Sequence, residues 1–204
     1  MMKKIKLVSI VSCFFLLLSS CTSEPVDSAL LPTMNPPTSN NGGGTVTNGT
    51  FSTTIEGQLY TATNIQAIKH LQLDPATSTT VVSYSITGNQ TSGTTGKSIV
   101  IQFDEDPSNQ YQTGLDINNP VGTAFVNYIN DLTAPTTTMY SSINQANQLT
   151  NTGSVNITAN NTTSQLISGN FQCTVYLFDT ATQQVLGTKV LTNGVFQNVH
   201  YTVQ

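Results

Sequence analysis

The chain has 204 residues and a formal net charge of −4, and only 8% of its residues are charged, against about 25% in a typical soluble domain. All six basic residues are lysines, three of them precede residue 7, and from Cys21 onward three lysines stand against ten acidic residues. Nucleic-acid partners and a basic membrane-surface patch on the folded part are therefore excluded, because both need clustered Lys and Arg.

Residues 1–20 have the composition of a secretory signal peptide. Lys3, Lys4 and Lys6 form a basic start. The apolar run Leu7–Leu18 that follows is too short to span a bilayer core as a helix. A basic start, a short apolar stretch and small residues before a cleavage point are typical of a signal that is removed from the mature protein.

The four residues Leu18-Ser19-Ser20-Cys21 resemble the lipobox of bacterial lipoproteins. This resemblance implies that the signal is cut before Cys21, and that Cys21 carries diacylglycerol and becomes the acylated amino terminus, with palmitate or a similar chain. Two or three acyl chains give lasting membrane anchorage, whereas one chain gives marginal binding.

The residues after the lipobox bear on location. Thr22 is not the Asp that retains such lipoproteins at the inner membrane, so the resemblance implies the outer membrane. Glu24 and Asp27 are a sparse version of the acidic residues that follow the cysteine in Bacteroidota surface lipoproteins. Both the periplasmic and the cell-surface side stay open.

Residues 21–50 are predicted to form a disordered tether. They contain Pro25, Pro32, Pro36 and Pro37 and the run Ser39–Gly44, and little here could bury an apolar surface. A flexible chain of this length spans about 30 Å on average, at ~5–6 Å × √n. That reach would hold the following domain clear of the lipid head groups.

Residues 51–204 predict a single all-β domain. Short runs rich in Val, Ile, Tyr, Phe and Thr alternate with Gly, Asn, Asp and Pro, a pattern typical of strands and turns. We expect about ten strands in an antiparallel β-sandwich or flattened barrel. The expected strands are Thr53–Gly57, Gln58–Ala62, Ile68–Leu73, Val81–Thr87, Lys97–Phe103, Ala124–Tyr128, Thr137–Ser141, Gly153–Thr158, Phe171–Leu177, Val185–Leu191 and Val199–Val203.

Local signals predict where these strands end. Turns are expected at Gly88-Asn89, Asn118-Asn119-Pro120, Asn160-Asn161 and Asn193-Gly194. The segment Ile65–Leu73 also fits a short helix, because its apolar residues lie at helical spacing. The flanking Thr and Asn residues favour a strand.

The C-terminal part of the chain resembles a Bacteroidota lipoprotein family of unknown function. In that family a strand with the pattern Gly-x-hydrophobic-x-Ile-Thr leads to Ile-Ser-Gly-x-Phe and then to a terminal Thr-Asn-Gly-x-Phe hairpin. The resemblance implies a secreted β domain and transfers no catalytic residues. The matching segments are Gly122–Phe125, Thr138–Ser142, Gly153–Thr158, Leu166–Phe171 and Leu191–Phe196.

The segment Gly88–Ser98 has a Gly-Lys-Ser ending like that of a phosphate-binding loop. The motif needs a glycine where this chain has Thr91, and it must open a helix. Ile99–Ile101 after it is a predicted strand instead. We interpret the segment as a hairpin loop, and we expect neither a nucleotide nor another cofactor.

Asp104, Asp106 and Asp116, with Glu105 between the first two, form the one acidic concentration. Carboxylate and amide oxygens are the ligands of Ca²⁺, so these three aspartates are a weak calcium candidate. The EF-hand pattern fails, because Asn109 stands where its glycine belongs. A solvated loop at a strand end is the favoured interpretation, and no metal site is predicted.

The sequence offers few parts for catalysis. The two histidines, His70 and His200, lie in predicted strands, and no Gly-x-Ser-x-Gly nucleophile motif is present. Cys173, the only thiol left in the mature chain, shares a strand face with Phe171 and Val175. We therefore expect it to be buried and inert, without a disulfide partner.

Two triplets match the Bacteroidota O-glycosylation pattern of Asp, then Ser or Thr, then a small or apolar residue. They are Asp27-Ser28-Ala29 in the tether and Asp179-Thr180-Ala181 in a predicted turn. This resemblance makes Ser28 and Thr180 candidate glycosylation sites. Chance accounts for such triplets too, in a chain with 19 Ser and 34 Thr.

These features predict a lipid-anchored β module of the cell envelope with a non-catalytic binding or structural role. Its expected partners are the membrane, through the lipid, and a protein or glycan that the sequence does not identify. The alternative is a hydrolase of envelope glycans or peptides, which would need a convergent set of acidic or histidine side chains.

Overall fold

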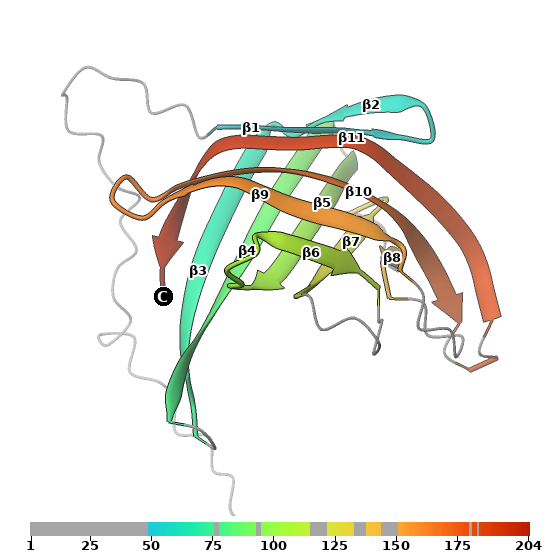
Figure 1. Ribbon diagram of the computed structural model, residues 1–204. Coiled ribbons are helices and arrows are strands. Elements are labelled where there is room, and N and C mark those ends of the chain that lie inside the picture. The colour runs from blue at the N-terminus through green and yellow to red at the C-terminus, as the bar shows by residue number, and fades with distance from the viewer. Residues whose placement is uncertain are drawn as a thin grey trace, which may run out of the picture. The chain divides into compact units, whose positions relative to one another are not determined.

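The structure, a computed structural model, describes residues 49–75, 78–92, 95–114, 122–132, 138–143, 151–179, 181–182 and 184–204. This part of the chain is all-β, as predicted, and forms one sheet of 11 strands (Figure 1). Within it, no helix is long and apolar enough to cross a membrane. The strands are β1 (Thr50–Ile55), β2 (Gln58–Thr61), β3 (Asn64–Asp74), β4 (Thr79–Ser92), β5 (Thr95–Asp104), β6 (Gln110–Thr113), β7 (Thr123–Ile129), β8 (Met139–Ser141), β9 (Gly153–Asn161), β10 (Leu166–Asp179) and β11 (Gln184–Val203).

The sheet closes on itself as a flattened barrel. Its strand order is β2-β1-β11-β3-β4-β5-β7-β6-β9-β10-β8, and β11 also pairs with β10. The hydrogen-bonded neighbours from β11 through β3 and round to β10 therefore form a ring. One layer contains β3, β4, β5 and β7, and the other contains β1, β11, β10 and β9 (Figure 1).

Two pairings depart from the predicted antiparallel arrangement. The end of β11 runs parallel to β3 at Tyr201–Val203, and β6 runs parallel to β7. β6 itself is a strand that the sequence analysis missed. It has four residues, and Tyr111 is its only large apolar side chain, so it carries too little alternation to be recognised.

The predicted hairpin at Asn193-Gly194 is wrong, because β11 runs through it as one strand. Asn193 has a φ of 53°, and the register of β11 shifts here against both β10 and β1. These are the marks of a β-bulge. The dipeptide bends the strand without reversing it, because β1 and β10 hold β11 from its two sides.

The predicted turn at Gly88-Asn89 is also wrong, because β4 continues to Ser92 and the hairpin to β5 is much shorter than expected. Gly88 faces the interior. A Cβ atom at this position would lie 2.7 Å from Cδ1 of Phe51. Glycine is needed here so that an aromatic ring can approach the backbone.

The segment Ile65–Leu73 belongs to β3, so the helical alternative is wrong. Ile65 and Ala67 are buried and Gln66 between them is exposed, which is the alternation of a strand with one face on the core. The predicted turn at Asn160-Asn161 is confirmed, since β9 ends at Asn161. The predicted turn at 118–120 lies outside the described residues.

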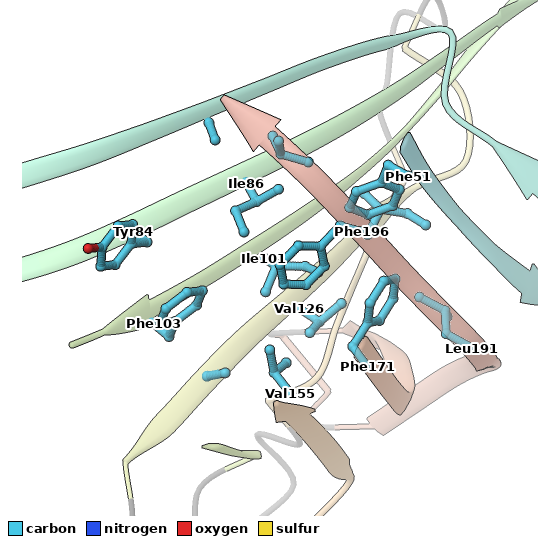
Figure 2. Close-up of a cluster of buried hydrophobic side chains, with 14 of the residues drawn as sticks. Phe51, Tyr84, Ile86, Ile101, Phe103, Val126, Val155, Phe171, Leu191 and Phe196 are labelled. Carbon is cyan, nitrogen blue, oxygen red and sulfur yellow. The ribbon is translucent and has the colours of Figure 1, made fainter. Parts of the chain in front are cut away.

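The core lies between the two layers and is built from alternate residues of each strand. Figure 2 shows Phe51, Phe171 and Phe196 gathered with Ile86, Ile101 and Val126, all labelled there. The Phe51 ring is 5.5 Å from that of Phe171 and 6.5 Å from that of Phe196, centroid to centroid. Outward-facing residues of the same strands are mostly Ser, Thr, Asn and Gln, so the functional surfaces are polar.

Candidate functional site

Several predicted site residues lie outside the described part of the chain. Cys21, Ser28, Asp116 and Thr180 are among them, so the lipid anchor and the glycosylation sites stay predictions.

Next to Thr180, the Asp179 carboxylate accepts hydrogen bonds from the Ala181 N–H (2.8 Å) and the Thr182 hydroxyl (2.7 Å). These bonds, that of the Thr182 hydroxyl above all, lower the pKa of Asp179, and Ala181 and Thr182 lie in a turn between β10 and β11.

Of the described acidic residues of the calcium candidate, Asp106 is engaged in a turn and Asp104 is not. Asp104 is exposed at the end of β5. Asp106 accepts a hydrogen bond from the Ser108 N–H at 2.8 Å, which lowers its pKa, and its own N–H donates to the Tyr111 hydroxyl at 3.0 Å. Across the described ranges, no three His, Cys, Asp or Glu side chains are placed to hold a metal ion.

The two histidines and the thiol are separated by the fold. His70 is on β3 and His200 on β11, and both project from the outer faces. Cys173 projects inward from β10 with 4% of its surface exposed, which confirms the predicted burial. Burial raises the pKa of its thiol to about 12, so it is neither a nucleophile nor a ligand at neutral pH.

The structure brings together a different set of residues, on the outer face of the layer formed by β3, β4, β5 and β7. A hollow of about 230 Å³ lies there, and we call it the Phe125 hollow. Its outward-facing lining consists of His70, Ser83, Ser85, Gln102, Asp104, Thr123 and Phe125.

Strand register arranges this lining in two rows. In the first row His70 pairs with Ser83, and Ser83 pairs with Asp104. In the second row Ser85 pairs with Gln102, and Gln102 pairs with Phe125. Side chains directly opposite on one face are close enough to act on one ligand.

The order of the first row bears on catalysis. In a Ser-His-Asp arrangement the imidazole must lie between the nucleophile and the carboxylate, and contact both. Here Ser83 lies between His70 and Asp104. The row therefore does not have the order of a catalytic triad. It offers a hydroxyl, an imidazole and a carboxylate as separate hydrogen-bonding groups.

This site was not predicted from the sequence, although one signal for it was present. The predicted strand Ala124–Tyr128 buries Ala124, Val126 and Tyr128. That alternation directs Phe125, a large aromatic residue, outward among polar neighbours. The residues that surround Phe125 are determined by the pairing of four strands. Local sequence patterns do not predict that pairing.

Comparison with known proteins gives no match: no protein-family model, no curated protein and no solved structure matches this chain.

Proposed function

We propose that this protein is a lipid-anchored, non-catalytic binding module of the cell envelope that holds a neutral glycan in the Phe125 hollow. The observation that carries the proposal is the partly exposed ring of Phe125 beside Gln102, Asp104 and His70. A sugar ring has an apolar C–H face and a rim of hydroxyl groups. The hollow supplies a partner for each.

The make-up of the hollow favours a neutral ligand. Asp104 is the one carboxylate among the residues that line the hollow, and no lysine is among them. The negative charge of Asp104 would repel an anionic sugar. Sites for small ligands combine an apolar surface with a few polar groups that fix orientation, and here one ring is combined with an amide, an imidazole and three hydroxyls. The openness of the face suits a chain of sugars that continues beyond the hollow.

The anchor in this proposal is Cys21, at the outer membrane. Its support is the resemblance of Leu18–Cys21 to a lipobox and of the C-terminal part to a Bacteroidota lipoprotein family. A secreted β domain on a tether of about 30 Å would present the Phe125 hollow away from the lipid surface. Both the anchor and its location are part of the proposal.

The proposal is tested by titrating the detergent-solubilised lipoprotein with oligosaccharides of glucose, galactose, mannose and N-acetylglucosamine in a calorimeter. We expect one of them to bind, and Phe125→Ala to weaken its binding about tenfold or more, since a ring contact contributes about 1.5 kcal/mol. Gln197→Ala, on the outer face of the other layer, is the matched control and should leave the affinity unchanged. Equal binding by Phe125→Ala would contradict the proposal.

The same samples test the hydrolase alternative. Shorter oligosaccharides would accumulate with the wild-type protein and not with Asp104→Asn or His70→Ala if these side chains were catalytic. That outcome would replace the binding function by hydrolysis. Chromatography of the sugars after long incubation makes the measurement.

A further inference from the structure

Each of the three lysines of the described residues lies two positions from a buried core residue of the same strand; Lys69 and Lys189 are half-buried and Lys97 is exposed. Lys69 follows Ile65 and Ala67 on β3, Lys97 precedes Ile99 on β5, and Lys189 precedes Leu191 on β11, each at a spacing of two. Residues two apart in a strand share a face, so the lysines continue the rows of core residues. A charged side chain in such a row requires that the interior open to solvent at that end.

Lys69 marks one end of the interior, where its charge is already balanced. Its Nζ lies 5.4 Å from the centroid of the Tyr84 ring. The Tyr84 hydroxyl donates to Glu105 at 3.3 Å and accepts from the Asn160 amide at 2.9 Å. At this end the lysine therefore lies beside a polar network that contains a carboxylate.

Lys97 and Lys189 mark a second opening, where the interior meets the β1–β2 hairpin. They come from different layers and line one hollow of about 200 Å³, whose wall includes the core residues Ile55, Tyr60 and Tyr128. We call it the lysine hollow. Mouths of closed β-sheets are common ligand sites.

The lining of the lysine hollow also contains one carboxylate. Glu56 lines the hollow, and its Oε1 accepts a hydrogen bond from the Val190 N–H at 2.8 Å. The residues that line the hollow therefore carry two ammonium groups and one carboxylate, a net positive charge in a domain that is otherwise acidic.

The two tyrosine hydroxyls of the lysine hollow donate to acceptors within the protein. The Tyr128 hydroxyl donates to Oδ1 of Asn130 at 2.8 Å, which leaves the Nδ2 of that amide as the atom free to donate. The Tyr60 hydroxyl donates to backbone carbonyl oxygens of Gly88 and Lys97. Burial raises the pKa of both tyrosines, so neither adds negative charge.

We propose that the lysine hollow is a binding site for a carboxylate-bearing sugar, with Lys97 and Lys189 on the carboxylate. Two charge-assisted hydrogen bonds hold the anion, and the Asn130 amide reaches a hydroxyl group. This site is separate from the Phe125 hollow and does not rest on the function proposed for it.

The test compares galacturonate with galactose, which have the same ring and differ in the carboxylate. The probes are titrated into the full lipoprotein in detergent and followed by calorimetry at low and at high salt. We expect galacturonate to bind and galactose not to bind, with affinity falling as salt screens the charges. Inorganic sulfate, added as a competitor, should displace galacturonate.

Lys97→Gln and Lys189→Gln should each weaken galacturonate binding about tenfold. Lys69→Gln is the matched control, because it removes the same charge at the other end of the interior. Equal loss in all three variants would mean that net charge and not the hollow attracts the anion, and it would overturn the proposal. So would absence of galacturonate binding to a wild-type protein whose thermal unfolding is cooperative.

Discussion

At the scale of single residues, Cys173 shows how the core sets chemistry. Its side chain fills space between the layers, beside Phe171 and Val175 on the same face of β10. Desolvation by burial raises the pKa of its thiol to about 12 from an ordinary value of 9.0. The folded protein therefore strongly favours the neutral thiol.

This burial predicts a pH-dependent effect of Cys173→Ala. At pH 7 the substitution should lower the free energy of unfolding by about 1 kcal/mol, the cost of a small cavity. Above pH 9 the thiol of the unfolded wild type ionises while that of the folded state stays neutral, so wild-type stability falls by about 1.4 kcal/mol per pH unit. The difference between the two proteins should therefore vanish near pH 10.

Urea unfolding of both proteins at pH 7, 9 and 10 makes this measurement. Comparing the two at each pH cancels the ionisation of the buried tyrosines, which both share. A difference that stays constant up to pH 10, or rapid labelling of the native thiol by a maleimide, would show that Cys173 is accessible.

The burial of a single residue could be predicted from the sequence where the alternation within one strand determines it. The burial of Cys173 follows from its place between Phe171 and Val175 in an alternating strand. The Phe125 and lysine hollows did not follow, because β3, β4, β5 and β7 build the first and β1, β2, β4, β5, β7 and β11 build the second. No local pattern states which strands become neighbours.

At the scale of elements, glycines opposite aromatic rings allow each ring to lie close against the backbone. Gly88 of β4 faces the Phe51 ring of β1, Gly169 of β10 faces Phe196, and Gly194 of β11 faces Phe171. Each ring covers the backbone of a glycine, which has no side chain of its own to fill that space. The Gly88–Phe51 contact joins the two layers, whereas the other two contacts lie between the neighbouring strands β10 and β11 of one layer.

Gly88→Ala should therefore be destabilising, by about 1–3 kcal/mol, the range for overpacking a core. The new methyl group would lie 2.7–3.0 Å from three atoms of the Phe51 ring, and that ring is held by its neighbours. Thermal unfolding followed by circular dichroism makes the comparison.

Gly187→Ala is the control for this substitution. Gly187 also lies in a strand, and there a Cβ atom would meet only Tyr140, at 3.7 Å, which is ordinary contact. Its melting temperature should be close to that of the wild type. Equal melting of Gly88→Ala and the wild type would mean that β1 does not pack on β4 as described.

Elements were predicted where alternation is strong, and turns were predicted less well. The strands around Ile99 and Val155 follow from their apolar alternation. The Gly88-Asn89 and Asn193-Gly194 signals failed, since pairing on both sides of β4 and β11 overrides the local preference for a turn. At the second position the preference for positive φ survives as the bulge at Asn193.

At the scale of the whole molecule, the proposed anchor makes a simple prediction. Cys21→Ser removes the sulfur that would receive the lipid. The variant should therefore accumulate as an unprocessed precursor or as a soluble form, because the β domain presents a mainly polar outer surface. Partition between detergent and aqueous phases, together with intact-mass measurement, distinguishes these products from the lipoprotein.

A Cys21→Ser protein that stays in the detergent phase with an unchanged mature mass would show that the anchor lies elsewhere. Cys173→Ala serves as the control for loss of a thiol, since it leaves the lipobox intact. It should partition like the wild type.

The position of β11 has a consequence for the order of folding. This last strand, of 20 residues, pairs with β1, β3 and β10, so the first strand of the domain finds its partner at the very end of the chain. Contacts of such sequence separation form slowly, because a long loop must close before any of them stabilises the fold. A chain whose β11 is still held in a ribosome therefore cannot complete these pairings, and the sheet closes only when β11 is free to pair with β1, β3 and β10.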